Sequence, residues 1–284
     1  ALDDNYTPYQ IEFPLDAGCR KKISIVCTIE DAYEKDAFAT AAAEMARFDA
    51  LEKKAGYHDE LAETLTIAAD HFLAYRQSTG LMTVLAGLPW FTDWGRDTMI
   101  ALTGLTLATG RYQDARDILT TFARYVHHGM VPNMFPDEGT APLYNTADAS
   151  MWYFYAVGKY LDYTGTPEDY AFVQETIYPK LKEIIAAYEH GTDFSIYMEE
   201  DGLIHAGSGL DQVTWMDVRV GDWVATPRHG KAGRNQCALV SCTLPDGRMG
   251  NALWGRRFPL CCSCSSCKGI FRKRILERKR RMSL

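Results

Sequence analysis

Long apolar runs are missing from the sequence. No stretch of its 284 residues approaches the roughly eighteen apolar residues that a helix needs to span a bilayer, so we expect no membrane partner. The opening residues, ALDDNYTPYQ, have neither the basic start nor the apolar core of a signal peptide, and they contain no initiator Met. We therefore expect a segment that was excised or processed from a longer chain.

Cysteine is scarce over most of the chain. Only Cys19 and Cys27 precede residue 237, although the whole sequence holds eight cysteines. A long body with so few thiols is typical of proteins that keep them reduced. We expect a cytoplasmic protein.

Basic residues are also scarce before residue 233. The chain holds 30 Lys and Arg against 37 Asp and Glu, and residues 233–284 take twelve of the former and two of the latter. This leaves 18 basic and 35 acidic side chains in the first 232 residues, a balance of −17. An acidic body does not favour nucleic acid, so we expect no such partner.

Helical periodicity dominates what is there. Residues 8–30 alternate and are rich in β-branched side chains, which predicts a strand near 21–29 and the end of a β-domain over residues 1–33. The Ala-rich residues 34–57 predict a linker helix. From residue 58 to 232, helical segments with glycines at their ends alternate with long loops. We predict a mainly α fold, a partial toroid of helical hairpins with a site at its mouth, whose helices cover 58–76, 96–110, 113–129, 147–165 and 166–191.

Three loops concentrate chemically useful side chains. Residues 88–98, 131–153 and 207–223 hold every Trp before residue 233, together with Arg and several carboxylates. A Trp ring matches the apolar face of a pyranose, while carboxylates and Arg hydrogen bond to its hydroxyls. Glycoside hydrolysis also needs one protonated carboxyl and one carboxylate. The loops therefore predict a carbohydrate cleft, although a single Trp is often buried core and the Arg96-Asp97 pair at a helix start is often a cap.

The same loops carry a family resemblance. GLPWFTDWGRDTMIALTGLTLATGRY resembles the amylo-α-1,6-glucosidase domain of glycogen debranching enzymes, and YNTADASMWYF and TWMD…ATPRHGKA are similar to further signatures of that family in the same order. The resemblance covers residues 58–232. It implies an (α/α)6 barrel that hydrolyses α-1,6-linked glucose at glycogen-type branch points with inversion, without a metal or another cofactor. Glycogen or a branched α-glucan is then the expected partner.

The resemblance also implies residue roles. Arg96 and Asp97 are expected to bind the terminal glucose, and Tyr144, Asn145 and Asp148 to line the same subsite. Asp217 is the expected general acid, with Asp211 as the second choice because it lies on the same loop. The remaining expected substrate-binding residues come from the same three loops: Trp90, Asp93, Trp94, Trp152 and Trp215.

The resemblance stops after Ala232. The family continues with A-V-E-I-N-A-L-W, whereas this chain continues with GRNQCALVSC. One permitted coding of Gly233–Thr243, read one base later, spells V-E-I-N-A-L-W-Y-H-A, so we expect a one-base insertion and an out-of-frame tail over residues 233–284. The tail's C-x2-C pairs (Cys261, Cys264, Cys267) are then not expected to bind zinc. The family's catalytic base and half of its barrel would be missing, so we expect this copy to be inactive.

Three other functions stay open. The chain could belong to another (α/α)6 glycosidase with a different linkage preference, glucoamylase-like or trehalase-like. It could be a glycan-binding module without catalysis, which would bind sugar and release none. The basic run FRKRILERKRR would otherwise favour an interaction protein, but an out-of-frame segment has no evolved partner.

Overall fold

The computed structural model describes residues 9–29, 31–88, 90–136, 141–233 and 235. It is mainly helical and divides into two compact units, residues 1–51 and 52–284. The helical elements are α1 (Ala37–Ala55), α2 (Glu60–Asp70), α3 (Gly95–Leu102), the π-turn η1 (Thr103–Leu107), α4 (Tyr112–Arg124), α5 (Ala149–Tyr163), α6 (Pro167–Phe172), the π-turn η2 (Val173–Ile177) and α7 (Tyr178–His190). Three antiparallel hairpins complete it: β1 (Leu73–Arg76) with β2 (Leu81–Val84), β3 (Tyr197–Met198) with β4 (Ile204–His205), and β5 (Arg219–Val220) with β6 (Trp223–Val224).

The N-terminal segment departs from expectation. Residues 9–29 form no strand, so the strand predicted near 21–29 is wrong. Ile23, Ile25 and Val26 are exposed there. A strand is stable only when its N–H and C=O groups pair with a neighbour, and no other described segment pairs with this one. The assignment of residues 1–33 to the end of a β-domain stays a prediction, whereas α1 confirms the helix expected within 34–57.

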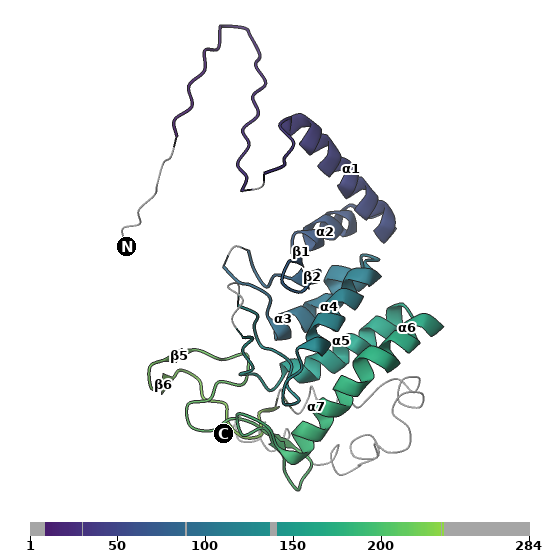
Figure 1. Ribbon diagram of the computed structural model, residues 1–284, viewed down its shortest axis with the longest axis vertical. Coiled ribbons are helices and arrows are strands. Elements are labelled where there is room, and N and C mark those ends of the chain that lie inside the picture. The colour runs from purple at the N-terminus through teal and green to yellow at the C-terminus, as the bar shows by residue number, and fades with distance from the viewer. Residues whose placement is uncertain (1–8, 30, 89, 137–140, 234, 236–284) are drawn as a thin grey trace, which may run out of the picture. The chain divides into compact units, whose positions relative to one another are not determined.

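In the second unit, α3, α4 and α5 lie alongside one another and alongside the long helical segment formed by α6, η2 and α7 (Figure 1). Helix α5 is buried along much of its length, since four of its side chains are fully buried: Tyr153, Ala156, Val157 and Tyr160. The Tyr153 hydroxyl donates a 2.8 Å hydrogen bond to the carbonyl of Leu119 in α4. Burial raises the pKa of Tyr153 well above its ordinary range, so this phenol remains a donor.

The helix predicted over residues 58–76 is too long. Helix α2 ends at Asp70, and Leu73–Arg76 instead pair with Leu81–Val84. Gly80, whose φ is +69°, completes the reversal between the two strands. The pairing wins over helical propensity because it brings Arg76 to a buried partner, Asp93.

The other helix boundaries largely follow the glycines. Gly110, Gly165 and Gly191 end their helices with positive φ, as predicted, and a capping box between Thr166 and Asp169 opens α6. Helix α4 is shorter than predicted and ends at Arg124. Gly129 serves another purpose, because a Cβ there would lie 2.1 Å from the Ala187 Cβ of α7.

One end of the second unit gathers the N-termini of α3 and α5 and the C-termini of α4 and α7. The Gly95 N–H donates to the Asn133 carbonyl at 2.8 Å, which joins the start of α3 to the loop after α4. The Tyr188 hydroxyl of α7 donates to the Ala147 carbonyl, also at 2.8 Å. Residues 130–136, 141–146 and 192–232 therefore share this end, which Figure 1 shows at the lower left.

Some expectations fall outside this description. The out-of-frame tail and its cysteines occupy residues 233–284, of which only residues 233 and 235 are described. Among the described residues, no helix is both long and apolar enough to cross a membrane.

We predict that Gly95→Ala destabilises the protein. A Cβ at this position would lie 2.0 Å from the Pro132 carbonyl oxygen, so the loop and α3 would have to separate. Such overpacking costs about 1–3 kcal/mol, measurable by urea unfolding. Gly104→Ala is the matched control, because a Cβ there meets nothing within 4 Å and should be neutral or stabilising. Equal stability of the two variants would contradict the close approach.

Candidate active site

A buried ion pair lies where α3 and α5 begin. The Arg96 Nε lies 2.8 and 2.9 Å from the two carboxylate oxygens of Asp148. The Thr146 hydroxyl accepts from Arg96 at 3.2 Å and donates to Asp148 at 2.9 Å. Arg96 is 5% exposed and Asp148 fully buried. We call Arg96, Thr146 and Asp148 the arginine cluster.

Local structure explains why these side chains meet. Arg96 occupies the first turn of α3, where a cation opposes the helix dipole, and the Asp148 carboxylate compensates for it. Asp148 precedes α5 but does not cap that helix with its side chain. Its carboxylate is thus committed to α3, and the cluster fixes the two helix starts against each other.

A second buried carboxylate supports the same loop. Asp93 is fully buried, accepts a bidentate ion pair from Arg76 of β1, and accepts from the Thr83 hydroxyl of β2 at 2.8 Å. The Arg76 guanidinium also lies over the Phe135 ring. These contacts favour an organising role for Asp93, whose direct contact with substrate stays a prediction. Sequence analysis missed Arg76 and Thr83, because their segment carried a helical pattern.

Polar atoms without protein partners surround the start of α3. Trp94 Nε1 and Asn133 Oδ1 are buried and, among the described residues, hydrogen bond to nothing. The Asn133 amide nitrogen donates to Asn145 Oδ1 at 3.4 Å, which brings the predicted Asn145 to this place. Buried donors and acceptors left in this way are suited to a polar ligand or ordered water.

Tyr144 is placed by its hydroxyl, which donates to the Tyr125 carbonyl at 2.7 Å. Burial, with a contribution from nearby Tyr125, raises the pKa of Tyr144, so the group stays a neutral donor. Its ring faces His127, with ring centroids 5.6 Å apart. The Tyr144 hydroxyl is therefore already engaged with the backbone, and its ring packs beside His127.

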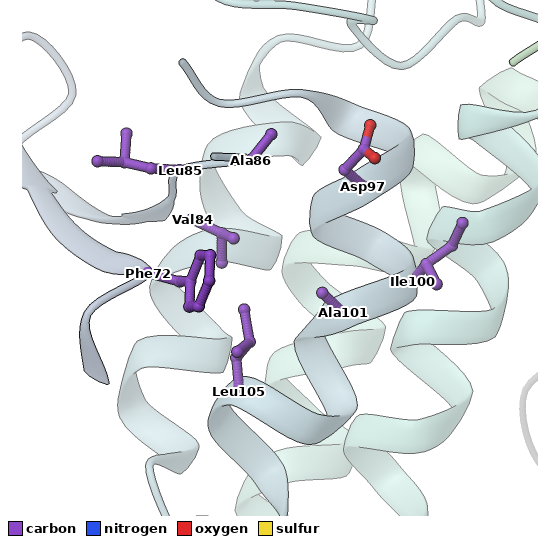
Figure 2. A pocket seen from close by; sticks show the side chains of 8 residues that line it. All are labelled: Phe72, Val84, Leu85, Ala86, Asp97, Ile100, Ala101 and Leu105. Carbon is purple, nitrogen blue, oxygen red and sulfur yellow. The ribbon is translucent and has the colours of Figure 1, made fainter. Parts of the chain in front are cut away.

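Asp97 does not join Arg96. Consecutive helical residues point about 100° apart, and Asp97 shares its side of α3 with Ala101 and Leu105. Figure 2 shows these residues along one side of a pocket of about 310 Å³, which Phe72, Val84, Leu85, Ala86 and Ile100 complete. Asp97 supplies the one carboxylate of this otherwise apolar lining. Arg96 and Asp97 thus point in different directions from α3, and their joint contact with one glucose stays a prediction.

The predicted Trp residues divide by exposure. Trp90 is 83% exposed and Trp215 46% exposed. The Arg228 guanidinium lies over the Trp215 ring, 5.7 Å from its centroid. Trp94 and Trp152 are half-buried. The Trp152 ring packs on the Tyr155 ring in an edge-to-face arrangement.

The two candidate acids differ in their contacts. The Asp211 carboxylate accepts from the Ser208 N–H at 2.9 Å and from its hydroxyl at 3.3 Å, so it shapes its own loop. Asp217 is partly buried, and its carboxylate has no hydrogen bond or ion pair to another described residue. The Ala147 N–H donates to the Val213 carbonyl at 2.8 Å, which fastens this loop beside Asp148. Nowhere in the described part of the chain do three metal-ligating side chains gather.

Residues 67–241 match the family model described as amylo-alpha-1,6-glucosidase, which is more than half of the chain. The chain belongs to the amylo-alpha-1,6-glucosidase family. The glycogen debranching enzyme of Saccharomyces cerevisiae is 29% identical to it over 210 residues, which cover 55% of this chain and 14% of that relative. The chain thus spans about one seventh of the length of this relative. The arginine cluster and all of the expected site residues, Asp217 included, lie inside the family match.

We predict that Asp148→Asn lowers the free energy of unfolding by about 3–5 kcal/mol, because it leaves the buried Arg96 charge uncompensated. Asp162→Asn removes an exposed ion pair with Lys159 and serves as the control, with an expected loss below about 1 kcal/mol. Urea unfolding of both variants measures the difference. A loss of similar size in the two would mean that the Arg96 pair is not buried as described.

Proposed function

We propose that this chain carries the glucose-binding and proton-donating part of a domain that hydrolyses α-1,6-linked glucose in glycogen or a branched α-glucan, with inversion. The observation that carries the proposal is the 2.8 Å hydrogen bond from the Ala147 N–H to the Val213 carbonyl. It joins the loop that carries Asp217 to the residue next to Asp148 of the arginine cluster. An (α/α)6 toroid of helical hairpins and a cytoplasmic location belong to the same proposal. The family membership and the aligned helices support the toroid.

The arginine cluster holds the terminal glucose in this proposal. Arg96 is rigid because two of its nitrogens are engaged, and a rigid donor loses little freedom when a sugar hydroxyl binds. Trp94 Nε1 and Asn133 Oδ1 offer a further donor and acceptor beside it. The Trp90 ring, which is 83% exposed, suits the apolar face of a neighbouring glucose unit, and the half-exposed Trp215 lies on the loop that carries Asp217.

Asp217 donates the proton. In the reaction, the bond between C1 and the glycosidic oxygen breaks, and the Asp217 proton passes to that leaving oxygen. A water attacks C1 from the opposite face and loses its proton to a second carboxylate, which inverts the configuration. Asp217 fits the first role better than Asp211, because the Asp211 carboxylate already accepts two hydrogen bonds from Ser208.

The second carboxylate is not one of the three that are engaged. Asp93 is held by Arg76, Asp148 by Arg96 and Asp211 by Ser208. A base that activates water needs free acceptor capacity at roughly 6.5–9.5 Å from the acid. The family resemblance implies a base further along the chain, so we keep the expectation that the 284-residue chain does not turn over by itself and that the base belongs to a longer chain with the reading frame restored.

We predict that Asp217→Asn lowers kcat by about 10²–10⁴-fold on a branched limit dextrin, measured by glucose release in the longer, frame-restored chain. The same variant should retain hydrolysis of α-glucosyl fluoride, since fluoride leaves without a proton. Asp222→Asn, in the exposed turn between β5 and β6, is the matched control and should change neither rate.

Three results would contradict part of the proposal and favour an alternative. Normal dextrin hydrolysis by Asp217→Asn, with loss in Asp211→Asn, would transfer the acid role to Asp211. Faster cleavage of maltose-type than of isomaltose-type ends would favour a glucoamylase-like enzyme. Tight glucan binding with no glucose release by the frame-restored protein would favour a glycan-binding module.

A further inference from the structure

The candidate acid sits on a closed loop. Residues 211–229 leave the body of the unit and return to it, with the β5–β6 hairpin at the far end. At the base, the Asp211 carbonyl and His229 Nε2 are 3.0 Å apart and form a hydrogen bond. One residue further on, Ala206 and Gly230 exchange two backbone hydrogen bonds, at 2.9 and 3.2 Å. We call residues 206–211 together with 229–231 the loop base.

Lys231 clamps this base to the neighbouring hairpin. Its ammonium lies 2.5 Å from a Glu199 carboxylate oxygen and 2.6 Å from one of Asp201. His205 of β4 approaches the other Glu199 oxygen at 3.2 Å. The hydrogen bond from Lys231, with that of His205, lowers the pKa of Glu199. Burial alone would lower the pKa of Lys231, but Asp201 and Glu199 outweigh it and raise it, so the ion pairs persist at neutral pH.

The opposite side of the base is held by a strained turn. Phe194 and Ser195 have φ of +57° and +53°, which non-glycine residues adopt only when their surroundings impose it. The Phe194 carbonyl accepts from the Gly207 N–H at 2.9 Å, and the Ser195 and Ser208 hydroxyls lie 3.0 Å apart. Gly207 has no room for a side chain, since a Cβ would lie 2.8 Å from the His229 ring.

We propose that Lys231 is a positioning residue, which fixes the base of loop 211–229 and thereby the place of Asp217 relative to the arginine cluster. This inference rests on the proposed role of Asp217. The partly buried Asp217 side chain makes no hydrogen bond or ion pair to another described residue, so the backbone that carries it largely sets its place. That backbone is tied at Val213 to the start of α5 and at Asp211 to His229.

The ion pairs act locally rather than on overall stability. Lys231 and both its partners are partly exposed, and such pairs contribute little to global unfolding. They do, however, restrict where the ends of a long loop can go. Loss of the clamp should therefore increase opening of the loop and leave the helices unchanged.

Hydrogen exchange in the 284-residue chain tests the clamp without requiring activity. In Lys231→Met, we expect exchange of the amides of residues 206–213 and 225–230 to rise about tenfold, while α3 and α5 stay unchanged. Lys231→Arg should restore most of the protection. Glu199→Gln weakens the same clamp from the other side and should give a smaller rise. Lys180→Met is the matched control, because it removes a partly exposed ion pair with Glu183 on α7.

Three outcomes would overturn the inference. Unchanged loop exchange in Lys231→Met would show that the ion pairs do not hold the base, and an increase spread equally over α5 would show only general destabilisation. In the frame-restored chain, Lys231→Met should lower kcat with little change in KM and keep the pH profile. Loop opening with normal kcat would remove the positioning role, whereas the Asp217→Asn comparison tests the proposed function separately.

Discussion

The ion pair between Arg96 and Asp148 sets the geometry of this end of the molecule. Two charges taken out of water cost several kcal/mol each unless their hydrogen bonds are nearly complete. Arg96 and Asp148 meet that condition with each other and with Thr146, and the pair can form only if α3 and α5 begin side by side. The close approach of Gly95 to Pro132 belongs to the same constraint, since the loop after α4 must pass over the start of α3.

The other parts of the site are connected to the Arg96–Asp148 ion pair one after another. Ala147, next to Asp148, holds Val213, and Val213 begins the path to Asp217. The far side of the loop returns to His229, which hydrogen bonds to the Asp211 carbonyl, and to Lys231, which forms ion pairs with the β3–β4 hairpin. Asp217 is thus carried on a segment that is fastened at both ends, at Val213 and at His229. If the arginine cluster holds the terminal glucose and Asp217 is the acid, as proposed, this division between a rigid cluster and a tethered carboxylate suits a group that has to meet the substrate's leaving oxygen.

The parts of the fold that local chemistry determines were predictable. Glycines with positive φ end three helices, and the Thr166 capping box opens α6, because these signals act within a few residues. The β1–β2 hairpin was not predictable. Its segment has a helical pattern, and the deciding contact, Arg76 with Asp93, joins residues 17 positions apart.

Prediction of the site from the sequence has the same limit. Its residue types and loops were expected from Trp and carboxylate content, and the family resemblance named Arg96 and Asp148, which the fold then brings together. Thr146 and Lys231 gave no separate signal, because their importance lies in partners that are distant in sequence. The separation of Asp97 from Arg96 follows from helix geometry, which adjacency in the sequence conceals.

The most direct test follows the Arg96 Nε–H signal by ¹⁵N nuclear magnetic resonance while glucose is added to the 284-residue chain. Its hydrogen bond to buried Asp148 should give a distinct, slowly exchanging resonance. If the arginine cluster holds the terminal glucose, this signal shifts and saturates with glucose, and Arg96→Lys abolishes binding while the protein stays folded. A signal that does not move at saturating glucose, or unchanged glucose binding by folded Arg96→Lys, would contradict the account.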